Sequence, residues 1–159
     1  LRDICTPGAL KFATYINAYM QESGDTDLTD ACETVLSERK PDFAFLYMVE
    51  TDEKGGHDHC GMSEEYLKRI SIAIDNVKRM IEKFGDEYSV ILMADHGGHD
   101  RSHGSTMPED MTIPLFFLGK EFPKGKEIEG DISLLEIAPT IAKILGIPAE
   151  AEWEGKPVF

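Results

Sequence analysis

The chain has 159 residues, 42% of them hydrophobic and 29% charged, which is the length and composition of one ordinary globular domain. Thirty acidic residues against sixteen basic ones give a formal net charge of -14; such a surface repels a phosphate backbone, so we expect no nucleic-acid polymer as a partner. Three widely spaced cysteines without a CxxC pair argue against a disulfide framework, and no apolar run is long enough to span a membrane, so we expect a cytoplasmic protein without a membrane partner.

The first forty residues predict a helical lead-in. Apolar residues recur at roughly helical spacing over residues 9–23, and Gly24 is a natural stop, so we expect a first helix there. Asp27 or Thr29 can cap a second helix, which should run to about Arg39. A proline shortly afterwards prevents this helix from continuing.

The middle of the chain predicts a strand, a long helix and a second strand. The uninterrupted apolar run at 43–49 is typical of a strand covered on both faces in a parallel sheet. Ser63 and two glutamates open a helix with a continuous apolar stripe, and Gly85 ends it. The apolar run at 88–93 then completes a βαβ unit, whose crossover should be right-handed.

The last third predicts one more strand and a final helix. A polar, glycine-containing loop at 97–110 leads to a strand at 111–119, in which Pro114 implies a strand start or an edge. The spacing of Ser133 and Glu136 is that of a capping box at the start of a helix.

These elements together define the expected fold class. We predict a single α/β domain over residues 1–159, with a mostly parallel sheet flanked by helices. Residues 1–40 form the helical lead-in, and residues 41–159 form the core that carries the candidate site.

All five histidines lie in two short segments, each directly after a predicted strand. With the nearby aspartates, the segments contain Asp52, His57 and His59, and Asp95, His96, His99 and His103. A single Asp or His after a strand is more often a turn former or a helix cap. Because the carboxyl ends of neighbouring parallel strands share one edge, however, Asp52 and Asp95 should lie on the same rim. Carboxylates and imidazoles are donors that borderline divalent ions accept, so the grouping favours a metal site.

The second segment also carries a family resemblance. Asp95-His96-Gly97-Gly98, leading to a later His-Gly pair, resembles the alkaline phosphatase superfamily, most closely its type I phosphodiesterase/nucleotide pyrophosphatase and sulfatase-like branches. Three further stretches, 56–66, 108–114 and 137–141, are similar to other elements of that family. The resemblance covers the chain from about residue 41 to residue 159 and implies an alkaline-phosphatase-like fold, of which this chain would be the incomplete C-terminal half.

The resemblance implies a cofactor and a set of ligands. In this family two divalent ions, commonly zinc and in some branches manganese, magnesium or calcium, flank a threonine or serine nucleophile. Carried over by position, Asp52, His57 and His103 would hold one ion, and Asp95 with His96 would help to hold the other. Three more residues could orient ligands, contact the substrate or simply be solvated: His59, His99 and Arg101.

Two departures from the family pattern affect these assignments. The family spacing from Asp to His is four residues, whereas Asp52 and His57 are five apart; either an extra glycine is looped out or Glu53 is the ligand, and we prefer Asp52. The family's nucleophile and a further aspartate ligand belong to an N-terminal half, so we assign no catalytic residue here and expect the nucleophile upstream of Leu1. The chain alone should therefore be inactive or nearly so.

The main functional hypothesis from the sequence is a metal-dependent hydrolase of phosphate mono- or diesters, acting on a small phosphate or sulfate ester as part of a longer chain. Paired cations suit this chemistry because they stabilise both the attacking and the leaving oxygen. The alternatives are a sulfatase, a phosphoglycerate-mutase-like phosphotransferase and a non-catalytic metal-binding domain. The sequence leaves open whether the protein is a homo-oligomer.

Overall fold

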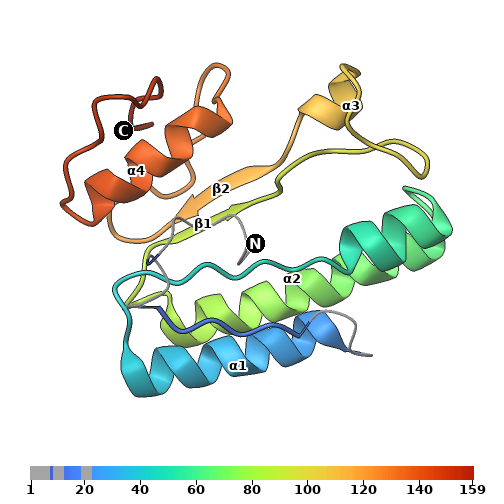
Figure 1. Ribbon diagram of the computed structural model, residues 1–159, viewed down its shortest axis with the longest axis horizontal. Helices are drawn as coiled ribbons and strands as arrows, with labels where there is room; N and C mark the ends of the chain where they lie inside the picture. The colour runs from blue at the N-terminus through green and yellow to red at the C-terminus, as the bar shows by residue number, and fades with distance from the viewer. Residues whose placement is uncertain (1–7, 9–12, 19–22) are drawn as a thin grey trace.

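The computed structural model describes residues 8, 13–18 and 23–159, which form an α/β arrangement. The helices are α1 (Gly24–Arg39), α2 (Glu64–Phe84), α3 (Pro108–Met111) and α4 (Ile137–Ile144), with a π-helix at Thr51–His57 and a 3₁₀ helix at Leu134–Glu136. The strands are β1 (Val90–Met93) and β2 (Leu115–Leu118). Helices α1 and α2 pack together on one side of the strands, and α4 lies on the other side (Figure 1).

Helix α2 forms where the sequence predicts it. Ser63 is its N-cap, and the Ser63 hydroxyl oxygen accepts a hydrogen bond from the backbone N–H of Tyr66 at 3.2 Å. Two glutamates occupy the first turn, where the helix dipole favours negative charge. At the other end the N–H of Gly85 donates to the carbonyl oxygen of Ile81 at 2.8 Å. Both predicted ends of this helix are confirmed.

The capping box before the last helix is also formed. The N–H of Leu135 donates to the Ser133 hydroxyl oxygen at 3.3 Å, and the N–H of Ser133 donates to the Glu136 carboxylate at 3.0 Å. These two bonds satisfy backbone donors that a helix start leaves without partners. The 3₁₀ helix then continues directly into α4.

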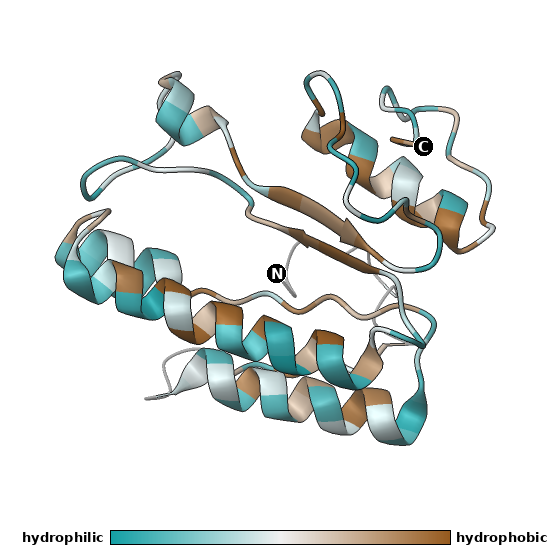
Figure 2. Ribbon diagram, turned by 180° about the vertical axis from the view of Figure 1, so that it is seen from behind, coloured by the Kyte–Doolittle hydropathy of each residue, from teal (hydrophilic) through white to brown (hydrophobic). Residues whose placement is uncertain are grey.

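The sheet differs from the mostly parallel sheet that the sequence predicts. Strands β1 and β2 are antiparallel, with Val90 opposite Leu118 and Met93 opposite Leu115. Both strands are hydrophobic throughout (Figure 2). Strand β2 covers only Leu115–Leu118 of the strand predicted at 111–119, and it begins directly after Pro114, where a strand start or an edge was expected. The α/β class is confirmed, but the described residues form only this two-stranded sheet.

The strand predicted at 43–49 is not formed. The segment is nevertheless extended and runs beside β1 (Figure 1): Tyr88 donates to the carbonyl oxygen of Pro41 at 3.0 Å, and Tyr47 donates to the Asp95 carboxylate at 2.8 Å. These bonds join residues 47 and 48 positions apart, so the segment and β1 run in the same direction. A strand without polar alternation needs cover on both faces, whereas the aromatic side chains here are 37% to 68% exposed. The predicted βαβ unit is therefore absent.

The N-terminal part also departs from the prediction. The expected helix at 9–23 lies largely outside the described residues, and its described part has no regular secondary structure. Helix α1 begins earlier than expected, so neither Asp27 nor Thr29 is its cap. Thr29 is instead fully buried, with its hydroxyl donating to the carbonyl oxygen of Asp25 at 2.7 Å. The predicted end of the helix at Arg39 is confirmed.

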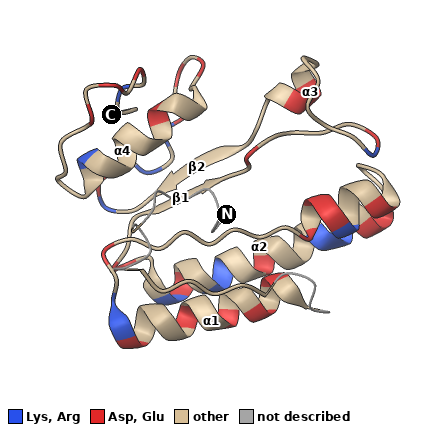
Figure 3. Cartoon of the chain, in the orientation of Figure 1, with Lys and Arg blue, Asp and Glu red and all other residues tan. Residues whose placement is uncertain are grey.

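Several polar residues are buried in the part of the chain that the structure describes. Charged side chains are spread over helices and loops and are absent from both strands (Figure 3). None of the helices in the described part of the chain is long and apolar enough to cross a membrane. Among residues 8, 13–18 and 23–159, the buried polar residues are Asp25, Thr29, Glu50, Asn76, Asp110 and Thr140, and the buried hydrophobic residues are Ala18, Leu36, Phe84, Phe122 and Ala142. Two of the buried carboxylates, Asp25 and Asp110, accept hydrogen bonds from backbone N–H groups of loop residues.

Candidate metal centre

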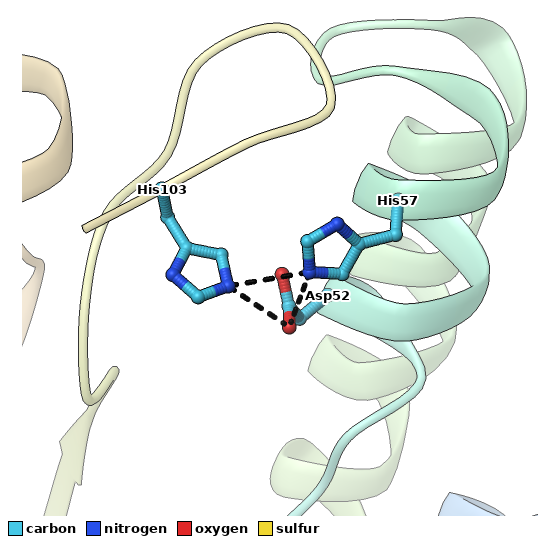
Figure 4. Close-up of side chains that lie close together, drawn as sticks. All are labelled: Asp52, His57 and His103. Atoms are coloured by element: carbon cyan, nitrogen blue, oxygen red, sulfur yellow. Dashed lines mark hydrogen bonds and ion pairs between the residues drawn. The ribbon is translucent and has the colours of Figure 1, made fainter. Parts of the chain in front are cut away.

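Three of the candidate ligands lie together. Asp52 and His57 belong to the π-helix, and His103 belongs to the loop between β1 and β2 (Figure 4). The Nε2 atoms of His57 and His103 are 3.2 Å apart, and Oδ2 of Asp52 lies 3.5 Å from the first and 3.8 Å from the second. The three side chains are 32% to 40% exposed, so a small ligand can reach them.

The π-helix places Asp52 and His57 on the same side of the chain. The N–H of Gly55 donates to the carbonyl oxygen of Glu50 at 3.0 Å, across five residues instead of the four of an α-helix. On an α-helix, side chains five residues apart point about 140° away from each other. The wider π turn brings residue 57 back over residue 52, so it absorbs the extra residue that separates this chain from the family spacing. The cluster contains Asp52 and not Glu53.

Backbone carbonyl oxygens orient two of the imidazole rings. Nδ1 of His57 lies 3.0 Å from the carbonyl oxygen of Arg101, and Nδ1 of His96 lies 2.8 Å from that of Gly97. A carbonyl oxygen only accepts hydrogen bonds, so each Nδ1 carries a hydrogen, and Nε2 is the nitrogen directed away from the backbone. In His57 this Nε2 faces Nε2 of His103. Histidines that bind metal ions are commonly oriented in this way.

The spacing of the three donor atoms fits one divalent ion. Two ligands of a tetrahedral zinc ion, each about 2.0–2.1 Å from the metal, lie about 3.3 Å from each other. The observed separations of 3.2, 3.5 and 3.8 Å need only small movements to reach this geometry. Two imidazole nitrogens and one carboxylate oxygen also form a three-ligand set that leaves a fourth position open.

Asp95 and His96 follow β1, and His96 lies next to the cluster. The His96 ring stacks on the His103 ring, with centroids 3.9 Å apart and planes 20° apart. Oδ1 of Asp95 accepts a hydrogen bond from the N–H of His96 at 3.1 Å, and Oδ2 accepts one from the Tyr47 hydroxyl at 2.8 Å. Burial, and then the bond to Asp95, raise the pKa of Tyr47 to about 12, so its hydroxyl remains a donor. Sequence reasoning missed Tyr47, because its position in an apolar run gave no signal.

His99 is bonded to the loop and not to the cluster. Its Nδ1 lies 2.7 Å from Oδ1 of Asp110, whose other oxygen accepts a hydrogen bond from the N–H of Ser105 at 2.8 Å. Bonds from Ser105 and His99 lower the pKa of Asp110 to about 2, and the bond to Asp110 raises the pKa of His99. Asp110 lies in α3, inside the segment predicted as loop. Pro108 followed by two acidic residues was an available signal for that helix start.

The two remaining candidates have no ligand atom in the cluster. His59 is exposed, and it is not among the grouped donors. The side chain of Arg101 is exposed as well, and only its backbone carbonyl contacts the cluster, through His57. Among the described residues, the donor group therefore consists of Asp52, His57 and His103.

Two buried carboxylates fasten the segment that enters the π-helix. The Asp25 carboxylate accepts hydrogen bonds from the N–H groups of Val49 at 2.8 Å and Glu50 at 3.0 Å. Burial raises the pKa of Asp25, and these two bonds partly offset the rise. The Glu50 carboxylate pairs with Lys54 at 2.7 Å and with Arg69 of α2 at 3.3 Å. Burial would raise the pKa of Glu50, but these pairings outweigh it and the pKa is lowered.

Similarity to known proteins extends over almost the whole chain. The family model described as the metalloenzyme superfamily matches residues 12–149. The chain belongs to this superfamily. It is 27% identical over 158 residues to the 2,3-bisphosphoglycerate-independent phosphoglycerate mutase of Salmonella choleraesuis (strain SC-B67), and 26% identical over 152 residues to that of Methylobacillus flagellatus. These alignments cover 92% to 94% of this chain, which spans only 28% to 29% of the length of the relatives. No solved structure matches the chain.

The names of these relatives correct part of the sequence-based prediction. They are mutases, so the prediction of a phosphodiester or phosphomonoester hydrolase is wrong. The predicted phosphodiesterase and sulfatase-like branch of the superfamily is also wrong, because the relatives belong to a different branch. The phosphoglycerate-mutase-like alternative is the better supported one. A motif of metal ligands did not separate the branches, because such a motif reports on the ions and not on the ester that they bind. Membership of a metalloenzyme superfamily and the Asp52, His57 and His103 group together support divalent metal binding.

Proposed function

We propose that the chain is the metal-binding part of a 2,3-bisphosphoglycerate-independent phosphoglycerate mutase, which transfers a phosphoryl group between positions of a small phosphorylated acid. The proposal rests on the Asp52, His57 and His103 group, which lies in a chain similar to mutases of this name. The alignments to these mutases cover 92% to 94% of the chain. Because the chain spans less than a third of those relatives, the complete reaction is proposed for the whole protein.

We assign Asp52, His57 and His103 to one divalent ion, and Asp95 with His96 helps to hold a second. Zinc suits the donor set and the distances, with manganese, magnesium or calcium as the alternatives. When bound, two such cations neutralise phosphoryl oxygens and lower the pKa of a nucleophilic hydroxyl. That hydroxyl is proposed to come from upstream of the present first residue.

The residues of this chain orient the ligands and leave access to them. The carbonyl of Arg101 keeps Nε2 of His57 directed at the cluster, and the ring stack keeps His96 beside His103. The exposure of the cluster suits a small phosphate ester. A net charge of -14 disfavours such an anion elsewhere on the surface, whereas bound cations would reverse the local sign at this site.

Metal binding is tested by thermal melting. Manganese or zinc at one hundred times its dissociation constant should stabilise the protein by about 2.7 kcal/mol and raise its melting temperature. His103→Ala removes one of three proposed ligands and should abolish most of the gain. His59→Ala changes an exposed histidine outside the cluster and should keep it. A wild-type melting curve that does not respond to saturating metal would contradict the site.

The reaction is tested on the natural protein by phosphorus NMR. With one phosphoglycerate isomer, manganese and no added 2,3-bisphosphoglycerate, we expect the signal of the second isomer to appear until the two reach equilibrium. His103→Ala should slow this interconversion strongly. Release of inorganic phosphate without interconversion would contradict the mutase proposal and would indicate a hydrolase.

A further inference from the structure

Tyr47 connects the two segments that carry the proposed ligands. It lies on the extended segment that leads into the π-helix and Asp52, and its hydroxyl donates to Oδ2 of Asp95, just beyond the end of β1, at 2.8 Å. The described residues show strand pairing between β1 and β2 only, so this segment is not held to β1 by a ladder of backbone bonds. The hydrogen bond from Tyr47 to Asp95 joins this segment to the end of β1 instead.

A second tyrosine makes a comparable bond at the other end of β1. The Tyr88 hydroxyl donates to the carbonyl oxygen of Pro41 at 3.0 Å. A tyrosine hydroxyl therefore joins the same two segments at each end of β1. The difference lies in the acceptor: Tyr88 bonds to a backbone carbonyl away from the cluster, whereas Tyr47 bonds to the side chain of a proposed ligand.

The two bonds to Asp95 fix the plane of its carboxylate. Its side chain is 54% exposed, so packing alone does not hold it in one rotamer. Oδ1 is held by the N–H of His96, and Oδ2 is held by Tyr47. Without the hydroxyl, Oδ2 would lose its partner, and only His96 would hold the carboxylate, through the N–H bond to Oδ1 and an Nε2 contact at 3.7 Å.

We infer that Tyr47 is a positioning residue, whose hydroxyl sets the orientation of the Asp95 carboxylate at the proposed two-ion site. This inference rests on the proposed function. Residues that hold a metal ligand in place typically change metal affinity by about 10- to 100-fold when they are removed. The same size of effect is expected here for one of the two ions.

The experiment is a manganese titration of the natural protein, followed by calorimetry and by electron paramagnetic resonance, which reports on the spacing of paired manganese ions. The wild type should bind two ions. Tyr47→Phe keeps the ring and removes the hydroxyl; it should bind one ion with wild-type affinity and the other about 10- to 100-fold more weakly. Tyr88→Phe loses a similar hydrogen bond and should bind both ions as the wild type does. Without metal, both variants should show a similar small decrease in melting temperature.

Each other outcome contradicts a defined part of the proposal. Wild-type affinity for both ions in Tyr47→Phe would overturn the role of Tyr47 and leave the proposed function intact. Equal weakening in both tyrosine variants would show that the two hydroxyls act through general stability, which also overturns that role. A wild-type protein that does not bind two ions would contradict the two-ion site and this inference together.

Discussion

Gly97 determines how closely the loop after β1 approaches α3. Its N–H donates to the carbonyl oxygen of Asp110 at 2.9 Å, and a Cβ built on it would lie 1.9 Å from the carbonyl oxygen of Glu109. The obstacle is backbone, so no side-chain rotation can relieve the clash. Any side chain at this position must push α3 and the loop after β1 apart.

Gly97→Ala should therefore lower the free energy of unfolding by about 1–3 kcal/mol, the usual cost of overpacking. It should also weaken metal binding, because the displaced backbone carries His96. Urea denaturation with and without manganese measures both effects. Gly98→Ala is the control: its Cβ would lie 3.4 Å from the carbonyl oxygen of Ser102, so a much smaller loss is expected. Equal losses in the two variants would contradict the steric explanation.

The pair of His99 and Asp110 stabilises the loop within a limited pH range. The bond to Asp110 raises the pKa of His99 above its ordinary value of 6.5, so this contribution is complete below pH 6.5 and is lost as the pH rises through the raised pKa. Bonds from Ser105 and His99 lower the pKa of Asp110 from 3.8 to about 2, so its contribution is present above 3.8 and is lost as the pH falls toward 2. Both contributions are present together from about pH 4 to pH 6.5.

His99→Gln should remove this pH dependence. The difference in urea midpoint between the wild type and the variant should be largest near pH 5.5 and should shrink above the raised pKa of His99. Measurements from pH 4 to pH 9 test the shape of this difference. His59→Gln changes an exposed histidine outside this pair and should show no comparable profile. A difference that stays constant over the whole range would mean that His99 contributes only packing.

Among the elements, the π-helix brings Asp52 and His57 together although five positions separate them in the sequence. The carbonyl oxygen of Glu50 accepts from the N–H of Lys54 at 3.1 Å and from the N–H of Gly55 at 3.0 Å, so the turn starts with an α-type bond and widens into a π-type bond. Single π turns of this kind are frequently found at functional sites. Here the widened turn allows Asp52 and His57 to face one another despite the extra residue between them.

Deleting Gly56 should therefore preserve metal binding. The deletion leaves the aspartate and the histidine four residues apart, and an ordinary α turn places such residues about 40° from each other. Inserting one more glycine after Gly56 places them six residues apart, about 120° away on an α-helix, and should abolish binding. Manganese titration of both variants is the measurement. Loss of binding in the deletion variant would show that the π turn itself is required.

The helices were more predictable than the sheet because their signals are local. The serine caps before α2 and α4 act on backbone groups within three residues, so the sequence shows them directly. A strand needs partners that are distant in the sequence, and the apolar run at 43–49 did not reveal that no ladder would form beside it. The α3 helix was missed although its proline start is a local signal, because its polar sequence resembles a loop.

For the molecule as a whole, the difference between local signals and distant contacts also explains which site residues could be predicted. The Asp52, His57 and His103 group consists of residues singled out from their type, their spacing and the family resemblance. Tyr47 and Asp110 were not singled out, because no local pattern in the sequence indicates the contacts that they make. Tyr47 bonds to a residue 48 positions away, and the Asp110 carboxylate is buried against a loop. Nor could the sequence reveal the antiparallel pairing of β1 and β2 that shapes the loop carrying His103.

The charge of the whole molecule works against its compact state. Thirty acidic residues exceed sixteen basic ones by fourteen, so folding brings like charges together. Opposing this are ion pairs, of which exposed ones such as Lys40 with Glu87, at 3.1 Å, contribute about 0–1 kcal/mol each. Salt weakens both effects, but the repulsion acts over longer distances and so is screened more strongly.

Raising NaCl from 0.01 to 0.15 M shortens the screening length from about 30 Å to about 8 Å. The urea midpoint of the protein, measured without divalent ions, should therefore rise over this range. The double variant Glu127→Lys, Glu129→Lys reduces the net charge from -14 to -10 in an exposed loop, so its midpoint should rise less. A midpoint that falls with salt would mean that short-range ion pairs outweigh the repulsion, and the acidic surface would then not be what limits stability.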